Sequence, residues 1–305
     1  MITVRHEAGL APDTPALGIL LALASFAMFT LMDTGVKLLG GHYHVLQVTW
    51  LNSLFALLAV TAIGLCRGGW HRLRPRQWRL HVLRWTVSYA ATLAIFWSYP
   101  RLPLADAYAI LFASPLLVTA LSVPILGERV GWRRWTAVAV GFSGVLVILA
   151  PGSGMIAWPA LVALAGAVGH AFNMLIIRKI GHNGSAEPLE AVGVVGNALT
   201  LLASSLLLPE VWLAPGPADL ALAAVAGAVG GAAFLLLAAA FRLAPAALVA
   251  PFQYSQMLYG ILVGWLVFLD RPSVRMLVGA AIVIGSGLYV LRRETAVRRA
   301  LGAAA

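Results

Sequence analysis

The sequence contains one long pattern twice. Residues Leu102–Leu149 and, about 141 residues later, Leu243–Leu291 each hold an apolar run interrupted by a proline, Pro115 or Pro251. In both copies a charged corner and a second apolar run rich in small residues follow. A period this long is far beyond that of a solenoid repeat. The chain is therefore predicted to consist of two similar halves, and this duplication restricts the folds it can adopt.

The composition is that of an integral membrane protein. Hydrophobic residues make up 61% of the chain, charged residues 10%, and the mean hydropathy is +0.90. A soluble domain carries about a quarter charged residues, which excludes a soluble globule. The charges cluster in short segments between long apolar runs. The net charge of +10 therefore reflects arginines beside membrane spans and does not indicate a nucleic-acid partner.

Cysteine and histidine usage gives no support for a metal centre. Cys66 is the single cysteine, so it can form neither an intrachain disulfide nor a cysteine cluster. The histidines are divided between the two sides of the membrane and cannot converge on one ion. The expected partners are the lipid bilayer and a small-molecule substrate, with no cofactor and no metal. The sequence leaves the oligomeric state open.

Ten segments are long enough to cross a hydrocarbon core, which takes about 20 residues each. Short turns containing Gly, Pro and charged residues separate them, and no linker indicates a separate soluble domain. The predicted spans are Ala16–Leu38, Val45–Leu65, Leu80–Pro100, Pro103–Leu126, Arg134–Ala150, Ala157–Lys179, Pro188–Leu208, Ala218–Phe241, Ala246–Leu269 and Arg275–Leu291.

The distribution of Lys and Arg predicts how these spans are oriented. Sixteen cations fall on the side that holds both termini, many of them in residues 67–79 and 292–299. Four fall on the other side: Lys37, Arg101, Arg271 and Arg275. Cytoplasmic loops carry the excess of positive charge, so both termini are predicted to be cytoplasmic in a bacterial-type inner membrane.

Five spans per half is an odd number, so the second half must enter the membrane upside down. The predicted halves are residues 1–150 and 151–305, and the expected fold is all-α with two inverted five-helix repeats. Secondary transporters built in this way bind their substrate where the repeats meet. Physical reasoning therefore favours a carrier.

Three segments also resemble a known family: Met32–Lys37 (MDTGVK), Leu102–Arg134 and Ala250–Glu294. They resemble the ten-span EamA-type carriers of the drug/metabolite transporter superfamily, and the resemblance covers nearly the whole chain. The second charged corner departs from the family pattern, because it reads LDRP where a Gly-Glu pair is usual. The resemblance implies alternating-access transport of small metabolites. We expect export of amino acids; the alternative is uptake of a compound such as S-adenosylmethionine or riboflavin.

Polar and aromatic side chains at mid-span depth are the candidates for substrate binding. Amide side chains in hydrocarbon are costly unless they meet a partner or water, which makes them candidates for a cavity lining. The alternatives are hydrogen bonds between helices and aromatic belts at the membrane interfaces. The candidates are Tyr89, Trp97, Phe112, Ser114, His170, Asn173, Gln253, Tyr254, Gln256 and Tyr259.

Four residues are candidates for gating or hinge motion. Asp33 and Lys37 have the i, i+4 spacing of a helical ion pair near the outer end of the first span. Asp33 is either a coupling carboxylate, part of an outer gate, or a paired helix-end charge. Pro115 and Pro251 each free a carbonyl four residues back and produce either a hinge or a static kink. Every carboxylate is predicted to lie near a span end, which favours facilitated diffusion or exchange over a proton relay.

One pattern is compatible with an enzyme. Gly141-Phe142-Ser143-Gly144 looks like the serine motif of intramembrane rhomboid proteases, and His170 lies in the next span. A serine nucleophile needs its base within hydrogen-bond reach. The second copy has small residues at the same place, which favours close helix packing. The protein is therefore expected not to be an enzyme, with an intramembrane serine hydrolase as the remote alternative.

Overall fold

The computed structural model describes residues 15–75, 78–127, 131–149, 158–181, 188–244 and 246–302. These residues form helices and contain no strand, which confirms the all-α prediction. The α-helices are α1 (Pro15–Gly40), α2 (Val45–Gly68), α3 (Trp78–Ser98), α4 (Leu104–Leu111), α5 (Ser114–Leu126), α6 (Trp132–Leu149), α7 (Trp158–Gly181), α8 (Leu189–Leu207), α9 (Pro217–Leu243), α10 (Ala246–Val249), α11 (Ser255–Phe268) and α12 (Val274–Gly302). The 3-10 turns are η1 (Trp70–Leu73), η2 (Tyr99–Arg101), η3 (Leu208–Glu210) and η4 (Ala250–Tyr254).

The ten predicted spans correspond to these helices. Seven segments in the described part of the chain are long and apolar enough to cross a membrane by themselves. The third span, α3, is more polar because Arg79 and Arg84 lie in its first half. The ninth span is broken into α10, η4 and α11. In the tenth, the apolar part is Val274–Val290, which is near the lower limit for crossing the hydrocarbon.

The fourth and ninth spans are both interrupted near their middles. In the fourth, α4 ends at Leu111 and α5 begins at Ser114, with Pro115 in the first turn of α5. In the ninth, the interruption is the 3-10 turn η4, with Pro251 in its first turn. A proline fits there because the first turn of a helix does not need its N–H. The predicted kinks are present at equivalent places in the two halves; their role as hinges stays a prediction.

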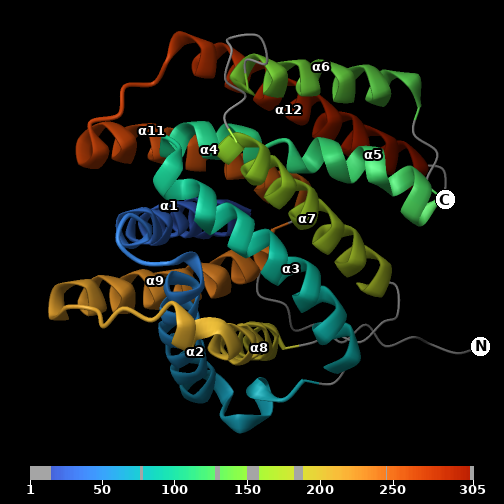
Figure 1. Ribbon diagram of the computed structural model, residues 1–305. Coiled ribbons are helices and arrows are strands. Elements are labelled where there is room, and N and C mark those ends of the chain that lie inside the picture. The colour runs from blue at the N-terminus through green and yellow to red at the C-terminus, as the bar shows by residue number, and fades with distance from the viewer. Residues whose placement is uncertain are drawn as a thin grey trace, which may run out of the picture.

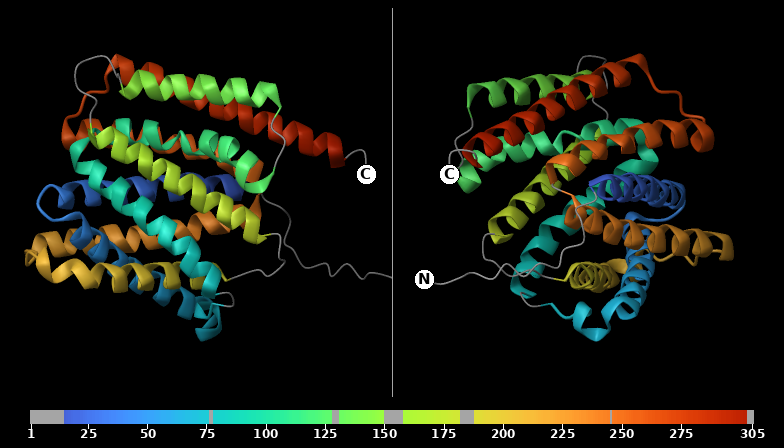
Figure 2. Two further views of the ribbon diagram at one scale, coloured as in Figure 1. Left: turned by 45° about the vertical axis from the view of Figure 1, so that its right-hand side comes forward. Right: turned by 180° about the vertical axis from the view of Figure 1, so that it is seen from behind.

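The helices pack in a pattern that repeats between the halves (Figures 1 and 2). The first span of the first half, α1, packs along the third span of the second half, α9. In the same way, the third span of the first half, α3, packs along the first span of the second half, α7. Three pairs join equivalent spans directly: α2 with α8, α4 with α11, and α6 with α12. This is the arrangement expected of two inverted five-helix repeats. Their predicted boundary, at residues 150 and 151, lies outside the described residues.

Four connections gather at one end of the bundle, at the left of Figure 1. They comprise residues 41–44, 99–103, 208–216 and 269–273, and we call this end the 41–44 face. Side chains of α1 and α2 hydrogen-bond to these connections: Lys37 to Leu102 O and Gln47 to Leu213 O. We call the opposite end, which carries η1, the 68–77 face, after the connection between α2 and α3; residues 76 and 77 lie outside the described part of the chain.

Glycines hold α6 and α12 in close contact at one edge of the molecule. A β-carbon added at Gly279 of α12 would come 2.7 Å from the carbonyl oxygen of Gly144 in α6 and 2.5 Å from Ile148 Cγ1. A β-carbon at Gly285, two turns further along α12, would meet nothing within 4 Å. The small residues of this span therefore serve packing at Gly279, whereas Gly285 is outside the contact.

Gly279→Ala should consequently destabilise the protein, because the new methyl group meets a backbone carbonyl that cannot move away easily. Overpacking of this kind costs about 1–3 kcal/mol. Gly285→Ala, in the same helix, is the matched control and should leave stability unchanged. Thermal unfolding of the two purified variants in detergent measures the difference, and equal midpoints would contradict the assigned contact.

Candidate functional site

A buried carboxyl group lies where α1 meets α4 and α11. Asp33 is 3% exposed, and its Oδ2 accepts hydrogen bonds from the Tyr108 hydroxyl at 2.7 Å and from Gln256 Nε2 at 3.3 Å. It lies seven residues before the end of α1, about 10 Å along the helix axis. Asp33 thus lies in the last third of α1, as expected, but it is enclosed between helices. The sequence could not show that α4 and α11 bring donors to this point.

Lys37 does not pair with Asp33, so the predicted i, i+4 ion pair is wrong. Its ammonium lies 3.0 Å from Asp270 Oδ2, 2.9 Å from the carbonyl oxygen of Leu102, and 4.3 Å from the ring centroid of Phe268. Asp270 is positioned by the end of α11, where its N–H donates to Gly264 O. The long side chain of Lys37 reaches this carboxylate on the second half of the chain. The pair thus connects the two repeats at the 41–44 face.

Four aromatic rings lie in a row of contacts beside Asp33, and Tyr99, at the end of this row, belongs to the 41–44 face. Phe112 lies between Tyr108, with ring centroids 6.5 Å apart and nearly parallel, and Tyr254, at 5.1 Å and edge-on. Tyr99 meets Tyr108 edge-on at 6.2 Å. We call Tyr99, Tyr108, Phe112 and Tyr254 the aromatic wall. The hydroxyl of Tyr254 and the Ser255 Oγ are buried and have no hydrogen-bond partner among the described residues.

Three of the predicted substrate-binding residues, Phe112, Tyr254 and Gln256, therefore converge with the candidate gating residue Asp33. Sequence reasoning left out Tyr99, Tyr108 and Asp270 as site residues. Tyr99 and Tyr108 were hard to distinguish from an interfacial aromatic belt. For Asp270 there was a signal, because the LDRP corner is the place where the chain departs from the family pattern.

Other predicted residues lie away from Asp33 and form bonds between helices. The hydroxyl groups of Tyr89 in α3 and Ser204 in α8 are 2.8 Å apart, and the Tyr89 ring stacks on Trp85. Ser114 Oγ donates to the carbonyl of Ala167 in α7 at 3.2 Å. These contacts fit the alternative of hydrogen bonds between helices.

The remaining candidates are distributed over α7, η4 and α11. His170 and Asn173 lie on α7, and Asn173 Oδ1 is buried without a partner among the described residues. Gln253 lies in η4, three residues before Gln256 of α11. Tyr259 packs beside the smaller apolar cluster of α1, α9 and Val249. Their roles in substrate binding stay predictions.

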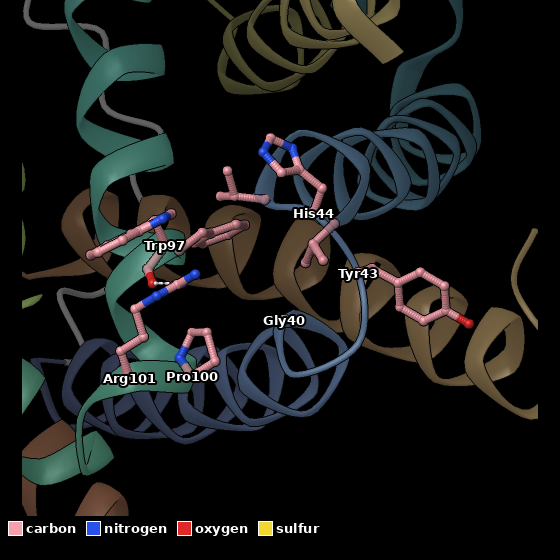
Figure 3. Close-up of a pocket in the computed structure, with 9 residues that line it drawn as sticks. Gly40, Tyr43, His44, Trp97, Pro100 and Arg101 are labelled. Atoms are coloured by element: carbon pink, nitrogen blue, oxygen red, sulfur yellow. Dashed lines mark hydrogen bonds between the residues drawn. The ribbon is translucent and has the colours of Figure 1, made fainter. Parts of the chain in front are cut away.

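Trp97 lines a pocket at the 41–44 face, shown in Figure 3. Its ring lies under the Arg101 guanidinium, 3.9 Å from the centroid, and Arg101 donates to the Trp97 carbonyl. The cavity measures about 50 Å³, far below the several hundred Å³ that a small-molecule site needs. This pocket is too small for a metabolite in the conformation seen here.

A second cavity lies between the ends of α4 and α11. It measures about 10 Å³ and is lined by Asp106, Asp270 and Gly260, among others. A β-carbon at Gly260 would come 2.6 Å from the Tyr108 ring, so Gly260 packs directly against that ring. The Lys37–Asp270 ion pair lies beside this cavity, because Asp270 is one of its lining residues.

The proposed serine motif is in a position that favours packing. Ser143 is exposed on α6, and its hydroxyl donates to Val140 O of the same helix at 2.7 Å. His170 is on α7, which packs against α3 and α5. Gly141 and Gly144 instead accommodate side chains and backbone of neighbouring spans. Among the described residues, no three His, Cys, Asp or Glu side chains gather in a way that could hold a metal ion.

Comparisons with known proteins agree with this architecture. The sequence model of the EamA-like transporter family matches residues 16–150 and again residues 157–292. The chain is 31% identical over 241 residues to a riboflavin transporter of Rhizobium johnstonii, covering 79% of this chain and 78% of that protein. It is 25% identical over 277 residues to an S-adenosylmethionine uptake transporter of Rickettsia prowazekii, covering 91% and 93%. A solved crystal structure at 20% identity matches the fold with a TM-score of 0.60, over 91% of this chain and 98% of that one.

The Tyr108 hydroxyl should contribute measurably to stability, because it is the closer donor to a buried carboxyl group. Tyr108→Phe leaves that group one hydrogen bond short, which costs about 1–3 kcal/mol. Tyr289→Phe, on the exposed side of α12, removes the same atom where no such cost is expected. Unfolding of the purified variants is the measurement. Equal stability of the two would contradict a structural role for the Tyr108–Asp33 bond.

Proposed function

The chain belongs to the EamA-like transporter family and is a multi-pass transporter of small metabolites in the inner membrane, and we propose that it takes up a planar, hydrogen-bonding compound such as riboflavin. The observation that carries this proposal is the aromatic wall next to Asp33 and Gln256. Flat rings stack favourably on aromatic side chains. Amide and carboxyl side chains can pair with the N–H and C=O groups on the edge of a flavin-like heterocycle.

A second substrate, S-adenosylmethionine, is favoured by the charge of Asp33. A buried carboxyl group close to aromatic rings is suited to a sulfonium cation, which both groups attract. The Rickettsia prowazekii relative takes up this compound according to its name, and the match covers most of both chains. Amino-acid export, the function first expected, has no counterpart among the relatives named above.

The proposed mechanism is alternating access between two inverted repeats, which we assign to the family matches at residues 16–150 and 157–292. The interrupted spans lie next to the aromatic wall, so bending at Pro115 and Pro251 would move its two sides relative to each other. Lys37 and Asp270 act as the gate at the 41–44 face, which is closed in this conformation. We assign this face to the periplasm and both termini to the cytoplasm, because the cations concentrate on the side of the termini.

Uptake of labelled riboflavin into proteoliposomes tests the substrate. Unlabelled riboflavin should compete, whereas tryptophan and phenylalanine should not. Competition by S-adenosylmethionine alone would favour the second substrate. Release of preloaded amino acids, with no riboflavin uptake, would contradict the proposal and restore the export prediction. Ser143→Ala should transport normally.

Tyr254 tests whether stacking recognises the substrate. Tyr254→Phe keeps the ring and removes only a hydroxyl group without a partner, so uptake should change little. Tyr254→Leu removes the ring and should lower uptake roughly fivefold to tenfold, since such a contact contributes about 1 kcal/mol. Both proteins should elute as folded monodisperse samples. Equal uptake by the two variants would remove Tyr254 from the binding site.

Exchanging the charges of Lys37 and Asp270 tests the gate. Lys37→Glu places two carboxylates opposite each other, and Asp270→Lys places two cations opposite each other. Either variant should lower uptake roughly tenfold, because like charges at such a contact cost more than about 1 kcal/mol. The double variant restores an attractive pair at the gate and should be faster than either single variant, although position 37 then carries no cation for Asp33. Arg275→Glu, exposed at the same face, is the control. A double variant as slow as the single ones would contradict the gate.

A further inference from the structure

Three carboxyl groups compete for one lysine near the 41–44 face. Lys37 binds Asp270 in this structure, and Asp106 lies close enough to interact electrostatically with both. Asp33 is four residues before Lys37 on α1, which is the spacing of neighbouring side chains on one helix face. A long lysine side chain can therefore reach either Asp33 or Asp270, but it cannot neutralise both at once.

The partners of Asp33 indicate how this carboxyl group is neutralised when Lys37 is elsewhere. Tyr108 and Gln256 donate to its Oδ2, and Tyr99 is a third neutral donor beside it. A buried carboxylate without a cation is expensive in a membrane interior. A proton on Oδ1 removes that charge and leaves the two hydrogen bonds in place.

Two further cations belong to connections of the 41–44 face: Arg101 of η2, which lies over Trp97, and Arg271, which lines the small cavity with Asp106 and Asp270. Arg67, Arg79, His81 and Arg84 of α2 and α3 lie toward the 68–77 face, and α9 carries Asp219 and Arg242 at its two ends. Among the described residues, the titratable groups that interact with Asp33 or Lys37 from elements packed against α1 are Tyr99 of η2, Tyr108 and Asp106 of α4, and Asp270 after α11.

We propose that Asp33 is the proton-binding site of the carrier and that it controls the Lys37–Asp270 gate through competition for Lys37. When Asp33 binds a proton from the periplasm, Lys37 is released to Asp270 and the 41–44 face closes, as it is here. When Asp33 loses that proton to the cytoplasm, its negative charge draws Lys37 back and the gate opens. The small cavity lined by Asp106, Asp270 and Gly260 lies beside this ion pair, and Gly260 packs against the Tyr108 ring.

This inference rests on the proposed uptake function and adds its driving force. Uptake should be coupled to inward proton movement, with one proton per cycle. A gradient of one pH unit can then support about tenfold accumulation of a neutral substrate. Substrate exchange, which the sequence favours because its carboxylates are predicted near span ends, would need no proton gradient.

The first test compares uptake with and without an inward proton gradient. The wild-type ratio should be well above one, and Asp33→Asn should reduce the ratio to one whatever its absolute rate, because the amide cannot exchange the proton. Asp33→Glu should retain a ratio above one. A wild-type ratio of one, or an undiminished ratio in Asp33→Asn, would overturn the proposal while leaving riboflavin uptake intact.

The second test needs no substrate, so it separates failure of this inference from failure of the proposed function. With Cys66 replaced by Ser, the variant Ala105→Cys places a thiol beside the small cavity below the gate. The rate at which this thiol is alkylated in membranes is measured between pH 6 and pH 8.5. At each pH, the rate is divided by the rate for the same thiol in a protein that also carries Asp33→Asn. The ratio should rise at least about fivefold with pH, as the open state gains population. A ratio that does not change with pH would refute the coupling.

Discussion

A carboxyl group inside a membrane protein must be neutralised or bonded, and the interior of this protein is arranged around that requirement. Asp33 meets Tyr108 of α4 and Gln256 of α11, so one buried group connects three helices from both halves of the chain. The hydrocarbon offers no water to replace a missing partner. A movement that separates these helices must therefore bring Asp33 another hydrogen-bond partner or a counter-charge. The chemistry of Asp33 is thereby linked to the arrangement of the helices.

The inverted repeat explains why the broken helices occur where they do. The fourth and ninth spans are equivalent, both are interrupted, and they pack against each other through α4 and α11. Irregular backbone is tolerated at membrane depth when it is enclosed by protein. The aromatic wall fills this region, with Phe112 and Tyr254 contributed by the two interrupted spans. Symmetry thus brings the two interrupted spans together beside the candidate site.

The contacts at the 41–44 face join the two halves of the chain through one side chain. Lys37 binds both Asp270 and the carbonyl at Leu102, so one side chain joins α1, the entrance to α4 and the turn after α11. The phenyl ring of Phe268 adds a further favourable contact for the cation. The two halves differ at this contact, because the charged corner of the second half carries Asp270 where the family usually has a Gly-Glu pair.

The amino-acid sequence by itself determined the membrane class, the helical spans to within a few residues, the duplication, and the kinks at Pro115 and Pro251, because hydrophobic length and proline chemistry act locally. It also identified Phe112, Tyr254 and Gln256 as polar or aromatic side chains near the middle of their spans. It could not determine that Asp33 turns away from Lys37, nor that Lys37 reaches Asp270, 233 residues later. Spacing along a helix states which partners are possible. Only the packing of α1, α4 and α11 decides which partner a buried charge has, because that choice depends on atoms brought together from distant parts of the chain.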